Sequence, residues 1–174
     1  MTRSSLVVFK LVYYTGASIW AVYLFKDSEV LPPWLGGKGS LANHYTNWPY
    51  SPQIPGLVIY SLVQMGYYLE DVVEHNFFRP KTNDYWEMNL HHLLTIGLFS
   101  GMILLNVVRS GALVSLLHNV SDIPTTSSRI LSQTVFKRST QISAATMIIV
   151  WFLVRNIAIP IFCIGCWYNL ILPP

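Results

Sequence analysis

Long apolar stretches alternate with shorter polar segments along this chain, and the pattern predicts membrane-spanning helices. A helix needs about 20 apolar residues to cross roughly 30 Å of hydrocarbon. Five segments approach that length, although the fourth is short: Leu6–Phe25, Ile54–Val73, Tyr85–Val108, Gly111–Ile123 and Ile142–Leu172. Pro124 is expected to interrupt the helix after the fourth segment, and Pro160 to break the fifth. We therefore predict an all-α membrane protein with about five transmembrane helices.

The polar segments between these helices are expected to lie at the membrane interface. Residues 27–53 combine prolines and glycines, which break helices, with tryptophans and tyrosines, which favour the lipid headgroups. Residues 125–141 are rich in serine and threonine, and we predict an interfacial helix or loop there.

Composition supports a membrane protein. Only 11% of the residues are charged and 52% are hydrophobic, whereas about 25% of the residues of an ordinary soluble domain are charged. At 174 residues the chain is expected to form a single polytopic domain, residues 1–174. A net charge of +3 is too small for a nucleic-acid binder. The expected partners are therefore membrane lipids and no nucleic acid.

A polar stripe runs through the apolar region from His91 to Asp122. At about 100° per residue, several polar residues of the third segment fall within an arc of roughly 100°: His91, His92, Thr95, Asn106 and Arg109. In the next segment His118 and Asp122 stand four residues apart and share a face. Ionisable groups at membrane depth usually face the interior of a bundle. We therefore predict that these two helices turn their polar stripes toward one cavity.

Other clusters of polar residues are given simpler interpretations. Zinc bound by the three histidines and Asp122 is conceivable, but adjacent histidines on one helix have poor geometry for it, so no metal is predicted. Cys163 and Cys166 lie in an apolar segment and are expected to pack, without a disulfide framework. The acids at the end of the second segment are expected to form a solvated helix end near Arg79 rather than a cavity wall: Glu70, Asp71 and Glu74.

The stretches HHLLT and NVVRSGALVSLLHNVSD resemble the central motif of the TLC-domain family, and of its ceramide synthases in particular. That motif is a His-His pair with Thr three residues on, then Asn-x-x-Arg-x-Gly, then His-Asp-x-Ser-Asp. The flanking stretches NWPYSP, GYYLEDV and FLVRNIAIPIF are similar too, so the likeness covers roughly residues 45–165. The resemblance implies a TLC-domain bundle. It also implies an endoplasmic-reticulum enzyme that joins the acyl group of acyl-CoA to the amine of a sphingoid base.

The resemblance also implies roles for individual residues. His91 and His92 would form the catalytic pair, since a neutral histidine can accept the amine's proton or carry the acyl group. His118 and Asp122 would support that pair. The expected substrate-binding residues are Thr95, Asn106 and Arg109. Acyl-CoA would be a substrate, and no cofactor is implied.

The sequence departs from the family pattern at Asn119, where the motif has its first aspartate. An amide cannot supply the negative charge that stabilises an imidazolium, and a comparable Asp-to-Asn change in a serine-protease triad lowers the rate about 10⁴-fold. The chain also stops soon after FLVRNIAIPIF, where the family's enzymes continue. We therefore expect an incomplete wall for the acyl tunnel.

Two functions are consistent with these observations. The departures favour a catalytically impaired, lipid-binding structural subunit of a larger membrane complex, for instance a respiratory complex in the mitochondrial inner membrane. The alternative is an active sphingoid-base N-acyltransferase of the endoplasmic reticulum. Small and polar residues on the last segment favour contact with other membrane protein subunits, with Arg155 paired to an acid of a partner or to a lipid phosphate.

Overall fold

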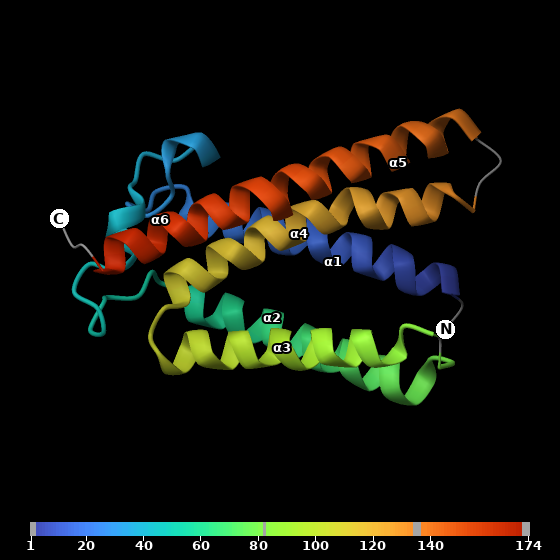
Figure 1. The fold of residues 1–174 in the computed structure, drawn as a ribbon, viewed down its shortest axis with the longest axis horizontal. Helices are drawn as coiled ribbons and strands as arrows, with labels where there is room; N and C mark the ends of the chain where they lie inside the picture. The colour runs from blue at the N-terminus through green and yellow to red at the C-terminus, as the bar shows by residue number, and fades with distance from the viewer. Residues whose placement is uncertain (1–2, 82, 134–136, 172–174) are drawn as a thin grey trace.

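The computed structural model describes residues 3–81, 83–133 and 137–171. Within these residues the chain consists of helices joined by loops, without strands, so the predicted all-α class is confirmed. Five long helical rods pack side by side (Figure 1). They are α1 (Arg3–Phe25), α2 (Leu57–Val73) with a π-helical turn (Glu74–Phe78), α3 (Tyr85–Leu104), α4 (Val108–Leu131), and α5 (Lys137–Phe152) continued by a π-helical turn (Leu153–Ala158) into α6 (Ile159–Ile171).

Helix α4 lies at the centre of the bundle and contacts α1, α2, α3 and α5. Its buried positions include small residues that let neighbouring helices approach closely: Ser110, Ala112, Ser115 and Ser121. This packing explains why the predicted short fourth segment is a full-length helix. Its apolar run is short because half of its ten buried residues are polar.

The turn between α3 and α4 differs from the prediction. Helix α3 ends at Leu104, and α4 begins at Val108. Between them Asn106 has a φ of 56°, a left-handed conformation that asparagine tolerates better than most residues. The prediction that Asn106 and Arg109 share one helical face with His91 is therefore wrong, because the helix does not extend to them.

Neither proline ends its helix, contrary to the prediction. Pro124 lies inside α4, which runs on to Leu131, and Pro160 lies in α6. A proline removes one helical hydrogen bond and its ring crowds the preceding turn. The π-helical turn at 153–158 widens the backbone just before Pro160, which makes room for the ring. Residues 125–131 and 137–141 are helical, one of the two forms predicted for this segment, and their interfacial position stays a prediction.

Two helices in the described part of the chain are long and apolar enough to cross a membrane, Ser5–Phe25 and Lys137–Tyr168. The second of these exposes large apolar side chains along its length: Ile142, Ile148, Ile149, Ile161, Ile164 and Trp167. A membrane location agrees with these exposed faces. The number of five membrane crossings stays a prediction.

The loop between α1 and α2 contains two 3₁₀ turns, Pro33–Leu35 and Leu41–His44. His44 anchors it, because its buried Nε2–H donates to the Val30 carbonyl over 3.0 Å. The Ser110 hydroxyl, 3.3 Å from Nδ1, donates to the other nitrogen. The His44 ring also meets Phe162 of α6 edge to face, at 5.2 Å between centroids. The neutral imidazole thus ties the loop to α4 and α6.

We expect the protein to lose stability in mild acid because of His44. Burial, reinforced by the positive charge of Arg109, lowers the pKa of His44 from 6.5 to about 4, although the Val30 hydrogen bond opposes this. The His44 imidazole therefore takes up a proton near pH 6.5 in the unfolded chain but only near pH 4 in the folded chain. Stability is complete above pH 6.5 and should fall by about 3 kcal/mol as the pH drops to about 4.

Denaturation in detergent micelles between pH 7.5 and 4 measures this effect. The control is His44→Gln, which cannot titrate and should show a flatter pH dependence over the same interval. Equal slopes for the two proteins would contradict the assignment to His44.

Candidate functional site

A cavity of about 920 Å³ lies between the helices, and we refer to it as the bundle cavity. All five rods contribute to its wall. Much of the wall is apolar or aromatic: Tyr68, Leu98, Phe99, Met102, Val114, Ile159, Phe162 and Trp167. The lysine, arginine, histidine and aspartate residues of the wall are Lys10, Asp71, Arg79, His91, His92, His118, Asp122, Arg129 and Arg155. The space therefore suits a molecule with a long apolar part and a polar group.

The structure brings together five of the seven residues for which the sequence predicts a catalytic or binding role. The five that line the bundle cavity are His91, His92, Thr95, His118 and Asp122. Helical periodicity predicts this convergence, since each stripe spans only one or two turns of a regular helix. The chemical roles of these residues stay predictions.

His92 is the most unusual residue of the cavity wall. Its side chain is only 3% exposed, and neither ring nitrogen has a hydrogen-bond partner among the described residues. Buried polar groups are rarely left without partners. His91 lies beside it on α3, at 5.8 Å between ring centroids, and His75 of the π-helical turn at 5.5 Å. His92 therefore has an unused hydrogen-bond donor and an unused acceptor in a ring that belongs to the cavity wall.

An ionic cluster lies beside His92. Asp71 of α2 pairs through Oδ1 with the Lys10 ammonium of α1 at 2.5 Å and with the Arg79 guanidinium at 3.2 Å. Arg79 also pairs with Glu74. The other oxygen of Asp71 lies 4.0 Å from Nε2 of His92. The prediction of a solvated acidic helix end is therefore wrong for Asp71 and Glu74, which are buried because two cations neutralise them.

His118 presents a defined tautomer to the cavity. Its Nδ1 lies 2.9 Å from the Val114 carbonyl one turn earlier. A carbonyl oxygen can only accept, so Nδ1 carries the hydrogen and Nε2 of the neutral ring keeps its lone pair. The described structure gives no hydrogen bond between Asp122 and this ring.

Asp122 instead pairs with Arg155, at 2.7 Å between Oδ1 and a guanidinium nitrogen. Nε of Arg155 also donates to the Ser121 hydroxyl over 3.2 Å. Arg155 therefore has its acid within the same chain. An acid of another protein or a lipid phosphate, which the sequence predicts as the partner of Arg155, is not needed to neutralise its charge.

We expect Asp122→Asn to destabilise the fold by about 2 kcal/mol, because it leaves the Arg155 charge partly buried without a counter-ion. The side chains of this pair are only 21% and 25% exposed. Asp122→Asn combined with Arg155→Met should recover part of the loss, since it removes both charges. Thermal melting of the solubilised variants measures the difference.

The matched control is Asp27→Asn, which removes the acid of an exposed ion pair with Lys26. That change should cost less than about 1 kcal/mol. If Asp122→Asn and Asp27→Asn melt alike, the Asp122–Arg155 pair contributes nothing to stability.

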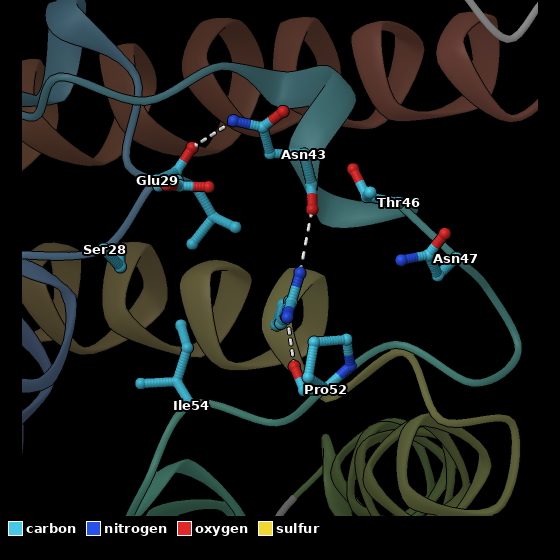
Figure 2. A pocket seen from close by; sticks show the side chains of 9 residues that line it. Ser28, Glu29, Asn43, Thr46, Asn47, Pro52 and Ile54 are labelled. Carbon is cyan, nitrogen blue, oxygen red and sulfur yellow. Dashed lines mark hydrogen bonds between the residues drawn. The ribbon is translucent and has the colours of Figure 1, made fainter.

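Asn106 and Arg109 lie outside the bundle cavity. Arg109 donates to the carbonyls of Asn43, over 3.0 Å, and of Pro52. These contacts cross a smaller pocket of about 290 Å³ on the loop side, shown in Figure 2. Asn106 donates to the Pro49 carbonyl and accepts from the Gln53 amide. Asn106 therefore fastens the loop to the α3–α4 turn and Arg109 fastens it to the start of α4. Neither residue lines the bundle cavity, so the structure gives no support to their predicted substrate-binding role.

Asn119 is fully buried and does not line the bundle cavity. Its Nδ2 donates to the Tyr60 hydroxyl of α2 over 3.2 Å, while its Oδ1 has no hydrogen-bond partner in the described residues. The amide at this position therefore packs between α4 and α2. Asparagine instead of aspartate at position 119 therefore removes no carboxylate from the wall around His92.

The residues described contain no group of three histidine, cysteine, aspartate or glutamate side chains that could hold a metal ion. Cys163 is an exposed free thiol and Cys166 a buried one.

Comparison with known proteins finds several ceramide synthases. Ceramide synthase hyl-2 of Caenorhabditis elegans is 26% identical over 169 residues, which cover 97% of this chain and 49% of the relative. Ceramide synthase LOH2 of Arabidopsis thaliana is 24% identical over 94% of this chain and 54% of its own length. Ceramide synthase 3 of Mus musculus is 30% identical over 88% of this chain and 37% of its own length. The chain thus spans about half the length of these relatives or less, and no solved structure matches it significantly.

The profile of the TLC domain matches residues 5–172, nearly the whole chain. The same region contains the His-His pair, the cavity and all five helical rods. This chain therefore belongs to the TLC-domain family and is similar to ceramide synthases.

Proposed function

We propose that this protein is a membrane N-acyltransferase that joins the acyl group of acyl-CoA to the amine of a sphingoid base and so forms a ceramide. The observation that carries this proposal is His92, whose two ring nitrogens are buried without partners in the wall of the bundle cavity. Similarity to ceramide synthases, over almost the full chain, supports the choice of substrates.

The reaction needs a base at one point. The amine nitrogen attacks the thioester carbonyl carbon, the C–N bond forms, and the C–S bond then breaks. In this proposal His92 takes the proton that the attacking nitrogen loses, and the imidazolium returns it to the departing thiolate. The products are one amide and one free CoA thiol. General base catalysis of this kind contributes about 100- to 10,000-fold to a rate.

The lining of the bundle cavity suits such substrates. Its apolar and aromatic wall can cover an aliphatic chain, while the histidines and ion pairs occupy limited parts of the wall. His118 is a second candidate base, because the Val114 hydrogen bond leaves its Nε2 lone pair free. His91 and Thr95 line the same cavity and can position the amine or the thioester oxygen.

The function that the sequence departures favour, an impaired subunit of a respiratory complex, has no support in the structure or in the comparisons. Asn119, its main argument, packs against Tyr60 away from the cavity wall. The relatives reported above are ceramide synthases. We therefore favour catalysis, in the endoplasmic reticulum as the family resemblance implies, over a site in the mitochondrial inner membrane. Association with other membrane proteins stays a prediction.

The test is a direct assay of the purified protein in phospholipid nanodiscs. Acyl-CoA and sphinganine are added, and ceramide and free CoA thiol are measured separately. We expect the two products to appear in equal amounts. Thiol release without ceramide would indicate hydrolysis instead, and the absence of both products above empty nanodiscs would overturn the proposed function.

A further inference from the structure

The carboxylate nearest to the His92 ring nitrogens in the described structure comes from α2, a helix outside the histidine motif. Asp71 lies with Oδ2 4.0 Å from Nε2 of His92, and the side chains of Asp71 and His92 are only 12% and 3% exposed. We propose that Asp71 is a positioning residue that holds His92 ready for proton transfer. This inference rests on the proposed function only for the identity of the reaction that His92 serves.

The two oxygens of Asp71 have different surroundings. Lys10 and Arg79 both bind Oδ1, at 2.5 and 3.2 Å. These contacts fix the carboxylate from the side away from His92 and favour its ionised form. Oδ2 has no hydrogen bond in the described residues and faces the imidazole. The cations thus orient one oxygen of Asp71 toward His92.

The other charged and titratable groups around His92 cannot replace Asp71. Lys10 and Arg79 are cations, and His75 and His91 can only add positive charge. The nearby Glu74 is paired with Arg79. Among the described residues, Asp71 is the acid whose carboxylate lies within 4.0 Å of a His92 ring nitrogen.

The arrangement has a direct consequence for proton transfer. When His92 takes the proton of the attacking amine, an imidazolium forms 4.0 Å from the Asp71 carboxylate. Attraction between opposite charges in a site shielded from water stabilises that state. The proton then passes to the thiolate, which restores the neutral ring. Asp71 touches neither substrate in this scheme and acts only through His92.

The experiment measures protonation of His92 directly, so that it does not depend on turnover. The protein is labelled with ¹³C-histidine, and the His92 signal is identified by its loss in His92→Gln. An opposite charge at about 4 Å moves a titration midpoint by about 1 to 3 pH units. We expect Asp71→Asn to lower the midpoint of His92 by about 1 pH unit or more, and Asp71→Glu to restore part of the shift.

Two controls make the result specific. Glu70→Gln removes the same charge from the adjacent, exposed position and should leave the midpoint unchanged. If Asp71→Asn fails to fold because Lys10 loses its partner, Lys10→Gln is compared with Lys10→Gln/Asp71→Asn, and the double variant should have the lower midpoint.

An unchanged midpoint after loss of Asp71 would overturn the inference, whatever the turnover. A lowered midpoint in a protein that makes no ceramide would support Asp71 as the partner of His92 while the proposed function fails. If ceramide is made, the acid side of the pH–rate profile should move in the same direction as the midpoint. A fall in rate at all pH values without that movement would indicate a merely structural role.

Discussion

Replacement of His92 by glutamine is expected to lower ceramide formation by about 100- to 10,000-fold, the contribution typical of general base catalysis. Glutamine fills a similar volume and can still hydrogen-bond, but it cannot accept a proton near neutral pH. The initial rate with saturating acyl-CoA and sphinganine measures the loss. Substrate binding should change much less than the rate, because the cavity wall keeps its shape.

The structure also predicts that this variant folds. His92 has no hydrogen-bond partner in the described residues, so its replacement breaks no hydrogen bond seen in the fold. The melting temperature of His92→Gln should therefore stay close to that of the parent protein. Leu93→Ala is the control, since Leu93 is the next residue of α3 and is 68% exposed. Equal rates for His92→Gln and Leu93→Ala would remove His92 from the mechanism.

Regular helical periodicity is the reason that the sequence predicts part of this site. His91, His92 and Thr95 lie within two turns of α3, and His118 and Asp122 within two turns of α4. Over such short spans the angle of 100° per residue accumulates little error. All five consequently line the bundle cavity, as expected from the pattern.

Helical periodicity does not predict a shared face when a turn of the chain lies between the residues. Asn106 and Arg109 fit the polar arc only if α3 continues past Leu104, and it does not. Their partners are the backbone carbonyls at positions 43, 49 and 52 and the side-chain amide of Gln53, all more than 50 residues away in sequence. No local pattern identifies such partners. A polar residue near a glycine or asparagine therefore gives weak evidence of which face it occupies.

The ionic cluster could not be predicted for a related reason. Lys10 and Asp71 are 61 residues apart, and only the packing of the bundle brings them together. A sequence signal exists all the same, because a lysine within an apolar helix needs a counter-charge. The acidic end of α2 is the natural source of one. The counter-charge that Lys10 requires therefore indicates a buried position for Asp71 instead of a solvated one.

Asn119 illustrates the limit of comparison by motif. The motif suggests that every polar position near His118 faces the reaction, so an amide at 119 is expected to reduce activity. In the structure Asn119 is directed to Tyr60 of α2, whereas Asp71 supplies the carboxylate near His92. The role of a motif residue depends on the face it occupies, and the loss of one carboxylate from a motif does not establish loss of activity.

Gly39→Ala is expected to destabilise the protein by about 4 kcal/mol, the sum of severe overpacking and two disturbed loop hydrogen bonds of about 1 kcal/mol each. A Cβ at position 39 would lie 2.1 Å from the carbonyl oxygen of Glu29, a backbone atom that cannot rotate away. Movement there would strain the hydrogen bonds from Gly39 to Leu31 and from Ser40 to Glu29. Thermal melting in detergent should show a decrease of about 10 °C in the melting temperature.

Gly66→Ala is the control, because no atom lies within 4 Å of its added Cβ and alanine suits a helix interior better than glycine. Equal melting temperatures for the two variants would mean that the loop accommodates a side chain at Gly39, contrary to this packing.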